Sequence, residues 1–172
     1  SATRAFTGAN ADITAASVDL DADSNTEAAA NINAGAGAGI ASIDFTTIVA
    51  TAAHDTESTV GNGTVMNVTG ALTMTADAVT TAAPSSTGGF SIAGVVNYSE
   101  TNLTTAIDSD TTAAIGDGVD ITAGSIRLDA EADHDAAAAS HTVSGSLFFE
   151  ISKIEQVAQD DGSVNVRIGN TG

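Results

Sequence analysis

The chain has 172 residues, enough for one ordinary domain, and carries 22 Asp and Glu against 4 Lys and Arg, a formal net charge of −18. Phosphate binding needs a basic surface, so this charge excludes nucleic acid as a partner and disfavours an anionic membrane surface. Cysteine is absent, which excludes disulfides and cysteine-based metal sites, whereas 42% apolar residues and a single proline indicate a folded chain.

The first of three expected units covers residues 6–59, and its clearest element is a half-buried strand at residues 18–22. Val18, Leu20 and Ala22 share one face of this strand, and aspartates occupy the other. A short β-rich piece, Ile13-Thr14, precedes it. The run AGAGAG at residues 34–39 is predicted to be a strand where backbone layers approach closely, with a flexible hinge as the alternative. A bulkier patch follows: Ile40, Ile43, Phe45 and Ile48.

The second unit covers residues 60–114 and repeats this order. It opens on Val60-Gly61-Asn62-Gly63, which is typical of a turn. Val68-Thr69 and a corner of small residues lead into an alternating strand at residues 72–76. The bulkier patch of this unit consists of Phe90, Ile92, Val95 and Tyr98.

The third unit covers residues 115–167, opens on Ile115-Gly116-Asp117-Gly118, and continues through Ile121-Thr122 into an alternating strand at residues 126–132. Residues 131–140 and 152–159 are alternatively helical, because the first segment is rich in alanine. The equivalent segments of the other units are rich in Thr, Gly and Ser and favour strand. The bulkier patch consists of Leu147, Phe149, Ile151 and Ile154, and the turn signal returns at Ile168-Gly169-Asn170.

The period is constant across the units, because Leu20, Met74 and Leu128 are evenly spaced (74 − 20 = 54; 128 − 74 = 54). A unit of fixed period cannot bury its apolar face alone and stacks on its neighbours. We therefore expect residues 1–172 to form a single repeat domain. Phe6-Thr7-Gly8 matches Val60-Gly61-Asn62, which places both ends of the chain in the same phase. This match predicts head-to-tail continuation, either by a longer chain or by neighbouring copies.

The stretch at residues 116–130 (GDGVDITAGSIRLDA) resembles the repeats of very large bacterial exoproteins of the filamentous-adhesin type. The Ala-Gly run and the apolar strand after it, residues 34–45, are similar to the same family. The resemblance implies an all-β fold, a right-handed parallel β-helix on the cell surface or in a secreted fibre. Because a one-coil repeat usually has about 20–30 residues, we expect two coils in each unit, and six coils with a rise of roughly 30 Å. A β-sandwich fibre subunit joined by donated strands is the alternative fold.

The stacked outward positions are the best candidates for chemistry. Stacking predicts one column of Asp21, Thr75 and Asp129 and a second column of Asp23, Asp77 and Glu131. Carboxylate columns of this kind are predicted to bind Ca²⁺ weakly through Asp21, Asp23, Asp77, Asp129 and Glu131, and a solvated acidic face is the alternative. The histidines are His54, His134 and His141. In Asp133-His134-Asp135 a surface histidine is expected, because the motif lacks the paired spacing of zinc sites, and a metal ligand is the alternative. No catalytic residue and no other cofactor site is predicted.

These features predict a structural, non-enzymatic protein that is extracellular or attached to the cell surface. The expected role is a segment or subunit of a surface fibre, adhesin stalk or biofilm-matrix filament, with copies of itself or the rest of a longer repeat chain as partners. No run of about 18 apolar residues is present, so we expect no membrane-embedded segment. A donor-strand β-sandwich filament subunit is one alternative. A glycan-binding or carbohydrate-active β-helix is less favoured, because the chain has one Tyr, no Trp and few basic residues.

Overall fold

The chain consists almost entirely of β-strands. The computed structural model describes residues 1–33 and 35–169, except for the side chains of residues 35, 36, 38, 87–92, 142 and 143. The described residues contain no helix, and the strands are β1 (Ala2–Phe6), β2 (Asp12–Ala15), β3 (Val18–Ile32), β4 (Gly35–Ala38), β5 (Ala41–Ala53), β6 (Asp55–Val60), β7 (Val65–Ala93), β8 (Val96–Asp108), β9 (Asp110–Ile115), β10 (Asp120–Ala136), β11 (Ala139–Ser146), β12 (Phe149–Asp160) and β13 (Ser163–Ile168). The strand prediction is therefore confirmed for both segments in which helix was the alternative.

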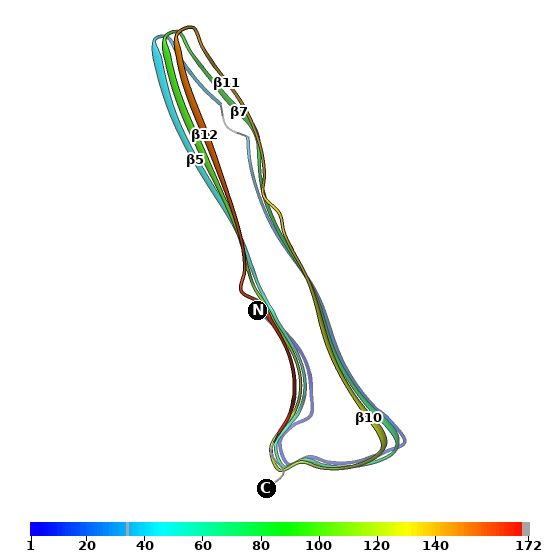
Figure 1. Ribbon diagram of the computed structural model, residues 1–172. Helices are drawn as coiled ribbons and strands as arrows, with labels where there is room; N and C mark the ends of the chain where they lie inside the picture. Colours follow the sequence, from blue (N-terminus) through cyan, green and yellow to red (C-terminus); the bar gives the residue numbers. More distant parts are fainter. Residues whose placement is uncertain (34, 170–172) are drawn as a thin grey trace.

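The strands form three sheets in which every pairing is parallel. One sheet has the order β1-β6-β9-β13, and a second has the order β12-β8-β5. In the third sheet β7 pairs with β2, β3 and β4 on one side and with β10 and β11 on the other. Leu72 pairs with both Val18 and Ile126, which lie one full period before and after it in the chain. The chain thus makes three passes over the same path: β2 to β6, β7 to β9, and β10 to β13 (Figure 1).

The expectation of two coils in each unit is wrong. Every pairing joins residues one whole unit apart, so each unit makes a single pass. The reason is the length of the strands, because β7 alone spans 29 residues and β5 and β8 span 13 each. Three passes at a strand spacing of about 4.8 Å give a stack roughly 14 Å high, not 30 Å.

The predicted register is confirmed for Leu20, Met74 and Leu128 but is wrong at two earlier positions. Phe6 pairs with Thr59 and not with Val60, and Ile13 pairs with Met66 and not with Val68. For Phe6 the cause is a difference of one residue at the corner, where the second pass contains one residue more than the first between Val68 and Leu72. For Ile13 the predicted partner is two residues too far along the chain, because Met66 and Val68 are both inward apolar residues of the same strand. The corner takes up the extra residue, so Ile13 and Met66 before it and Leu20 and Met74 after it all face inward.

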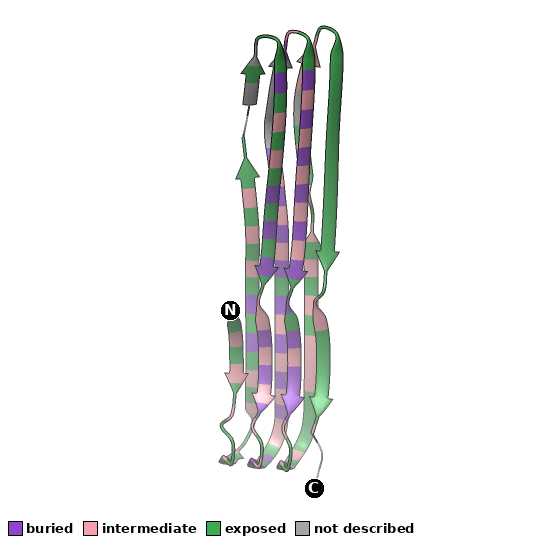
Figure 2. Cartoon of the chain, turned by 90° about the vertical axis from the view of Figure 1, so that its left-hand side faces the viewer, coloured by how far each residue is buried: buried purple, intermediate pink, exposed green. Residues whose placement is uncertain are grey.

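The second pass is the best buried, because it has a neighbour on each side (Figure 2). At the end where the chain turns after β9, the interior is apolar. Met66, Leu72 and Met74 are fully buried there, with Ile13, Leu20 and Leu128 of the outer passes packed against them. Further along, the facing layers are filled by small residues, and Ala52, Ala82 and Ile107 form a second cluster. The narrow interior explains the high alanine content.

Apolar side chains fill only part of the interior. Hydroxyl and amide side chains are buried at many inward positions: Ser24, Ser42, Thr56, Ser58, Thr64, Thr80, Ser86, Asn97, Ser99, Thr101, Thr105, Ser109 and Thr111. Several of them join the facing layers directly. Ser24 Oγ lies 2.6 Å from Thr56 Oγ1, and Ser58 Oγ donates to the carbonyl of Leu20 at 2.8 Å. Such bonds satisfy polar groups that would otherwise be buried at a cost.

The bulkier patches do not all face inward. Ile48 is buried, whereas Ile40, Ile43 and Phe45 are exposed, as are Leu147 and Phe149 of the third unit. The side chains of Phe90 and Ile92 lie outside the described residues. Gly35–Ala38 of the Ala-Gly run pairs with β7 as strand β4, which confirms the strand prediction there, while residue 34 lies outside the described residues.

Candidate functional site

The outward side of the sheet formed by β3, β7 and β10 is an acidic face. We use this name for nine outward carboxylates: Asp19, Asp21, Asp23, Glu27, Asp77, Asp129, Glu131, Asp133 and Asp135. They alternate along the strands with inward residues such as Ala22, Met74 and Ala76, which are buried. Arg127 is the only Arg or Lys on these three strands, and its Nη2 lies 2.6 Å from Asp129 Oδ2.

Both predicted columns are confirmed in the backbone register. Thr75 pairs with Asp21 and with Asp129, and Asp77 pairs with Asp23 and with Glu131. Most carboxylates of the outer passes meet a neutral residue of the second pass, as Glu27 and Asp135 both pair with Thr81. In these columns like charges are separated by two strand spacings in place of one, which limits repulsion. The column of Asp23, Asp77 and Glu131 is the exception, because it has a carboxylate in every pass.

The calcium prediction for Asp21, Asp23, Asp77, Asp129 and Glu131 stays a prediction. Within the described part of the chain, no three side chains of His, Asp or Glu come together in a group suited to a metal ion. Asp129 is also engaged by Arg127. The face can nevertheless attract counterions, because many carboxylates share it.

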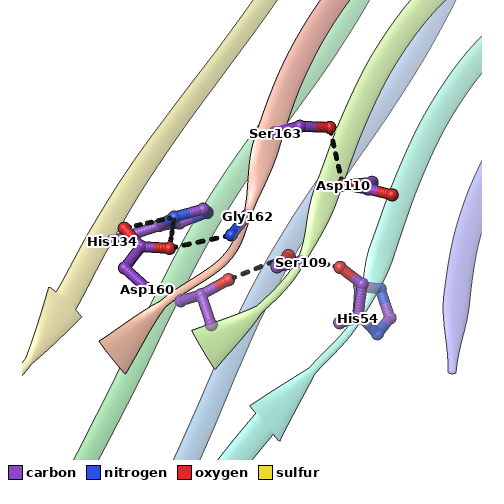
Figure 3. Close-up of polar contacts among 8 residues, drawn as sticks. His54, Ser109, Asp110, His134, Asp160, Gly162 and Ser163 are labelled. Atoms are coloured by element: carbon purple, nitrogen blue, oxygen red, sulfur yellow. Dashed lines mark hydrogen bonds and ion pairs between the residues drawn. The ribbon is translucent and has the colours of Figure 1, made fainter. Parts of the chain in front are cut away.

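A polar seam runs through the stack where the chain passes from β5 to β6, from β8 to β9 and from β12 to β13 (Figure 3). His54, Ser109 and Gly162 stand at these three junctions. Ser109 Oγ donates to the carbonyl of His54, and Ser163 N donates to the carbonyl of Ser109 at 3.2 Å. From the facing layer, Thr80 Oγ1 lies 3.4 Å from Ser109 Oγ.

In the third pass the seam contains an Asp-His pair. His134 Nδ1 of β10 lies 3.0 Å from Asp160 Oδ1 of β12, so the pair joins the two facing layers. Asp160 Oδ1 also accepts a hydrogen bond from Gly162 N at 3.0 Å. A Cβ added at Gly162 would strike the His134 ring and would lie 2.7 Å from the carbonyl oxygen of Ser109, so glycine leaves room for the imidazole.

The surface expectation is wrong for His134, whose side chain is 11% exposed. An Asp-His pair supplies two of the three members of a nucleophilic triad. Among the described residues, however, His134 Nε2 is buried without a hydrogen-bond partner, so no hydroxyl completes the triad there. His54 is half-buried and lies 2.6 Å and 2.8 Å from the hydroxyls of Ser1 and Thr3. His141 is exposed.

A charged cluster lies on the outward side of β8 and β12 and has no counterpart in the sequence prediction. Lys153 Nζ lies 3.1 Å from both Glu100 Oε1 and Glu155 Oε2, and Tyr98 OH donates to Glu100 Oε2 at 2.9 Å. The hydrogen bond from Lys153, followed by that from Tyr98, lowers the pKa of Glu100. The same contacts raise the pKa of Lys153, mainly through Glu100, and raise the pKa of Tyr98.

A glycine column stands at the turn that ends each pass: Gly8, Gly61, Gly116 and Gly169. A Cβ added at Gly61 would lie 2.7 Å from the backbone of Gly8 and Ala9, and one added at Gly169 would lie 2.5 Å from the carbonyl oxygen of Gly116. Each Cβ would thus point at the preceding turn, where the backbones touch. Gly8 is the exception, because nothing lies within 4 Å of its added Cβ.

None of the described residues forms a helix long and apolar enough to cross a membrane. Comparison of the chain with protein-family models, with curated proteins and with solved structures found no match.

Proposed function

We propose that the chain is a structural segment of an extracellular fibre, folded as a right-handed parallel β-helix with one coil in each unit. The observation that carries the proposal is the parallel register, in which every sheet pairs residues about one period apart. A solenoid built in this way extends along one axis, because each pass stacks on the pass before it and offers an equivalent surface to the pass after it. β-Sandwich layers are typically antiparallel, so the parallel register favours the β-helix over the sandwich subunit.

The open faces of the stack support continuation beyond the three passes. Ile115 and Ile168 pair with each other and face the same interior, yet Ile115 is 7% exposed and Ile168 is 69% exposed. The unpaired edges of β3 and β10 also present free backbone groups, which favour addition of a further strand. The resemblance to filamentous-adhesin repeats agrees with a fibre at the cell surface.

In a continuous joint between two copies, a strand of the incoming copy replaces one strand of the copy on which it stacks. β1 and β13 lie at opposite ends of the same sheet in equivalent places. When β1 of an incoming copy takes the place of β13 on β9, β3 of that copy lies directly on β10. Gly8 of the incoming copy then stands over Gly116, where only glycine fits. This joint gives Gly8 the role that the other turn glycines have within the chain. Ala16 would stand over Gly124, a corner that needs slightly wider spacing.

Electron microscopy of negatively stained protein tests the proposal. The wild-type chain at high concentration is expected to form long fibres, and Gly8→Ala is expected to give short particles, because its Cβ meets backbone only in the joint. Gly37→Ala is the matched control and is expected to form fibres like the wild type. An added Cβ at Gly37 has open space, and its partner in the register is the large residue Ile92, so this column does not require glycine. Dispersed small particles of the wild-type chain, or fibres unaffected by Gly8→Ala, would contradict the proposal.

A further inference from the structure

The sheet formed by β5, β8 and β12 is polar inside and apolar outside over the first half of its strands, whereas Ile48, Leu103 and Ile107 are buried further along. In β8, Asn97 is fully buried at 0% exposure, whereas its neighbour Val96 is 42% exposed. In β5, Ser42 is buried and Ile43 is exposed. Because β8 has a paired strand on each side, the exposure of Val96 does not come from an open edge. The alternation in this half of the sheet is therefore inverted relative to an ordinary surface sheet.

The outward residues of this sheet form an apolar face. We use this name for Ile43, Phe45, Val49, Val96, Tyr98, Phe149, Ile151 and Val157, which adjoin the exposed turn residues Ile40, Val95, Leu147 and Phe148. The register stacks Ile43, Tyr98 and Ile151 in one column. The rings of Phe45 and Tyr98 pack with their centroids 5.5 Å apart. Contiguous exposed apolar surface of this kind is typical of an interaction site.

Charge decides which occupant fits the apolar face. Its strands carry outward charges at Glu100, Asp108, Lys153 and Glu155, and Lys153 neutralises part of this small set. The acidic face carries nine carboxylates against one arginine. Two copies of a chain with net charge −18 repel one another through most of their surface. The apolar face is the broad surface through which they can approach at least cost.

The size of the apolar face also fits a pair of copies. A strand of 13 residues is roughly 40 Å long, and three strands are roughly 14 Å wide, so the outward side of this sheet, the apolar face together with its polar positions, covers about 600 Å². Two such faces bury about 1,200 Å² in total, which is the lower limit for a specific protein interface. The buried area increases with every copy added to a fibre, so the pairing strengthens with length.

We propose that the apolar face binds the same face of a second copy, in a two-fold pair that lies across the fibre axis. Ile43, Tyr98 and Ile151 of one copy pack against the corresponding column of the other. Lys153 stands within the same face as Glu100 and Glu155, so a two-fold arrangement brings each lysine toward carboxylates of the partner. The pairing uses outward side chains of β5, β8 and β12, whereas the head-to-tail joint uses the backbone edges of the outer strands. The pairing does not depend on end-to-end continuation.

Sedimentation velocity on Gly8→Ala tests the pair without fibre growth. The protein is expected to sediment as a dimer of a 16.8 kDa chain. Ile43→Glu combined with Ile151→Glu is expected to weaken the dimer at least tenfold in dissociation constant, because four carboxylates enter the contact. Asn25→Glu combined with Thr122→Glu adds the same charge to the opposite side, at exposed positions, and is expected to keep the dimer. Circular dichroism on each variant verifies that the sheet content is unchanged.

A monomer of Gly8→Ala at 100 µM would overturn the pairing, as would a dimer that survives both glutamate substitutions on the apolar face. A monomer that floats with vesicles of neutral phosphatidylcholine would also overturn it, because lipid would then be the occupant. If the wild-type chain forms no fibres, the wild type itself is expected to sediment as the dimer. Failure of the fibre proposal and failure of the pairing are therefore distinguishable.

Discussion

At the scale of single residues, substitutions of different turn glycines are expected to change either the stability of the chain or its assembly into fibres. A Cβ at Gly61 meets the backbone of Gly8 and Ala9 at 2.7 Å within the chain, whereas one at Gly8 meets nothing. Gly61→Ala is therefore expected to lower the free energy of unfolding by about 1–3 kcal/mol, the usual range for overpacking. Gly8→Ala is expected to leave it unchanged. Urea denaturation of dilute protein measures both values, and equal effects of the two substitutions would contradict this account of the column.

The Asp-His pair of the third pass allows a second prediction at this scale. Asp160→Ala removes the partner of His134 Nδ1 and the acceptor of Gly162 N, and leaves a mostly buried imidazole unsatisfied. The expected loss is about 1–3 kcal/mol of unfolding free energy, the usual cost of such a group. Asp161→Ala is the matched control, because Asp161 is exposed and lies outside this pair. A loss of the same size in both variants would show that the pair does not join the layers.

The position of His134 could have been predicted from the sequence. Leu128, Ala130 and Ala132 alternate inward, and the same alternation continues to residue 134. Its acidic neighbours Asp133 and Asp135 suggested a surface residue. Asp160 could not be found in this way, because the pairing crosses between layers that lie 26 residues apart in the chain. Contacts along a column follow from the period, whereas contacts across the interior depend on how the layers face each other.

At the scale of elements, the cluster on β8 and β12 predicts a dependence on pH. The folded chain holds the pKa of Glu100 below its usual range, chiefly through Lys153. Stabilisation by a carboxylate of lowered pKa is present above its unfolded pKa and is lost as the pH falls through the folded value. Glu100→Gln is therefore expected to destabilise the chain at pH 7 and to lose this effect as the pH approaches 3. Urea denaturation of both proteins across this range measures the difference, and a difference independent of pH would contradict the prediction.

The acidic face predicts that salt controls the head-to-tail joint. In the continuous joint, β10 of one copy lies on β3 of the next, so Asp129 meets Asp21 directly, without a neutral residue such as Thr75 between them, and Glu131 meets Asp23. Salt shortens the screening length from about 30 Å at 0.01 M to about 3 Å at 1 M. The lowest protein concentration that forms fibres is thus expected to fall severalfold as NaCl rises, as followed by light scattering.

Calcium tests the candidate ligands in the same assay. At matched ionic strength, Ca²⁺ is expected to favour fibres more than NaCl, because it can bridge carboxylates. Asp21→Asn combined with Asp129→Asn is expected to remove the advantage of Ca²⁺ and to allow assembly at low salt. Equal effects of the two salts would mean that the acidic face is a solvated surface. Assembly independent of both salts would contradict the joint itself.

The sequence predicts the inward and outward pattern well for some elements and poorly for others. Residues 18–22 and 72–76 alternate between apolar and polar residues, and their burial follows the pattern. In the first half of β5 and β8 the alternation also exists, but the large apolar residues Ile43, Phe45 and Val96 face outward. Hydrophobicity alone gives the wrong face there, because the narrow interior accepts Ser42 and Asn97 more readily than large side chains such as Phe45.

At the scale of the whole molecule, the period predicts the stacking but not the size of the coil. A repeat of this length is compatible with two short coils or with one long one, and only the pairing of β7 with β3 and β10 decides between them. One flat coil in each unit places many small residues between two long layers. Alanine and serine on facing strands keep these layers close, and the result is a thin, elongated cross-section (Figure 1).

The account depends on copies that continue the stack at the strand spacing, and fibre diffraction measures this directly. Aligned fibres of the wild-type chain are expected to give a reflection along the fibre axis at about 4.8 Å, with a longer axial repeat of about 14 Å from three passes in each copy. A 4.8 Å reflection perpendicular to the axis, or an axial repeat of about 30 Å, would contradict the account.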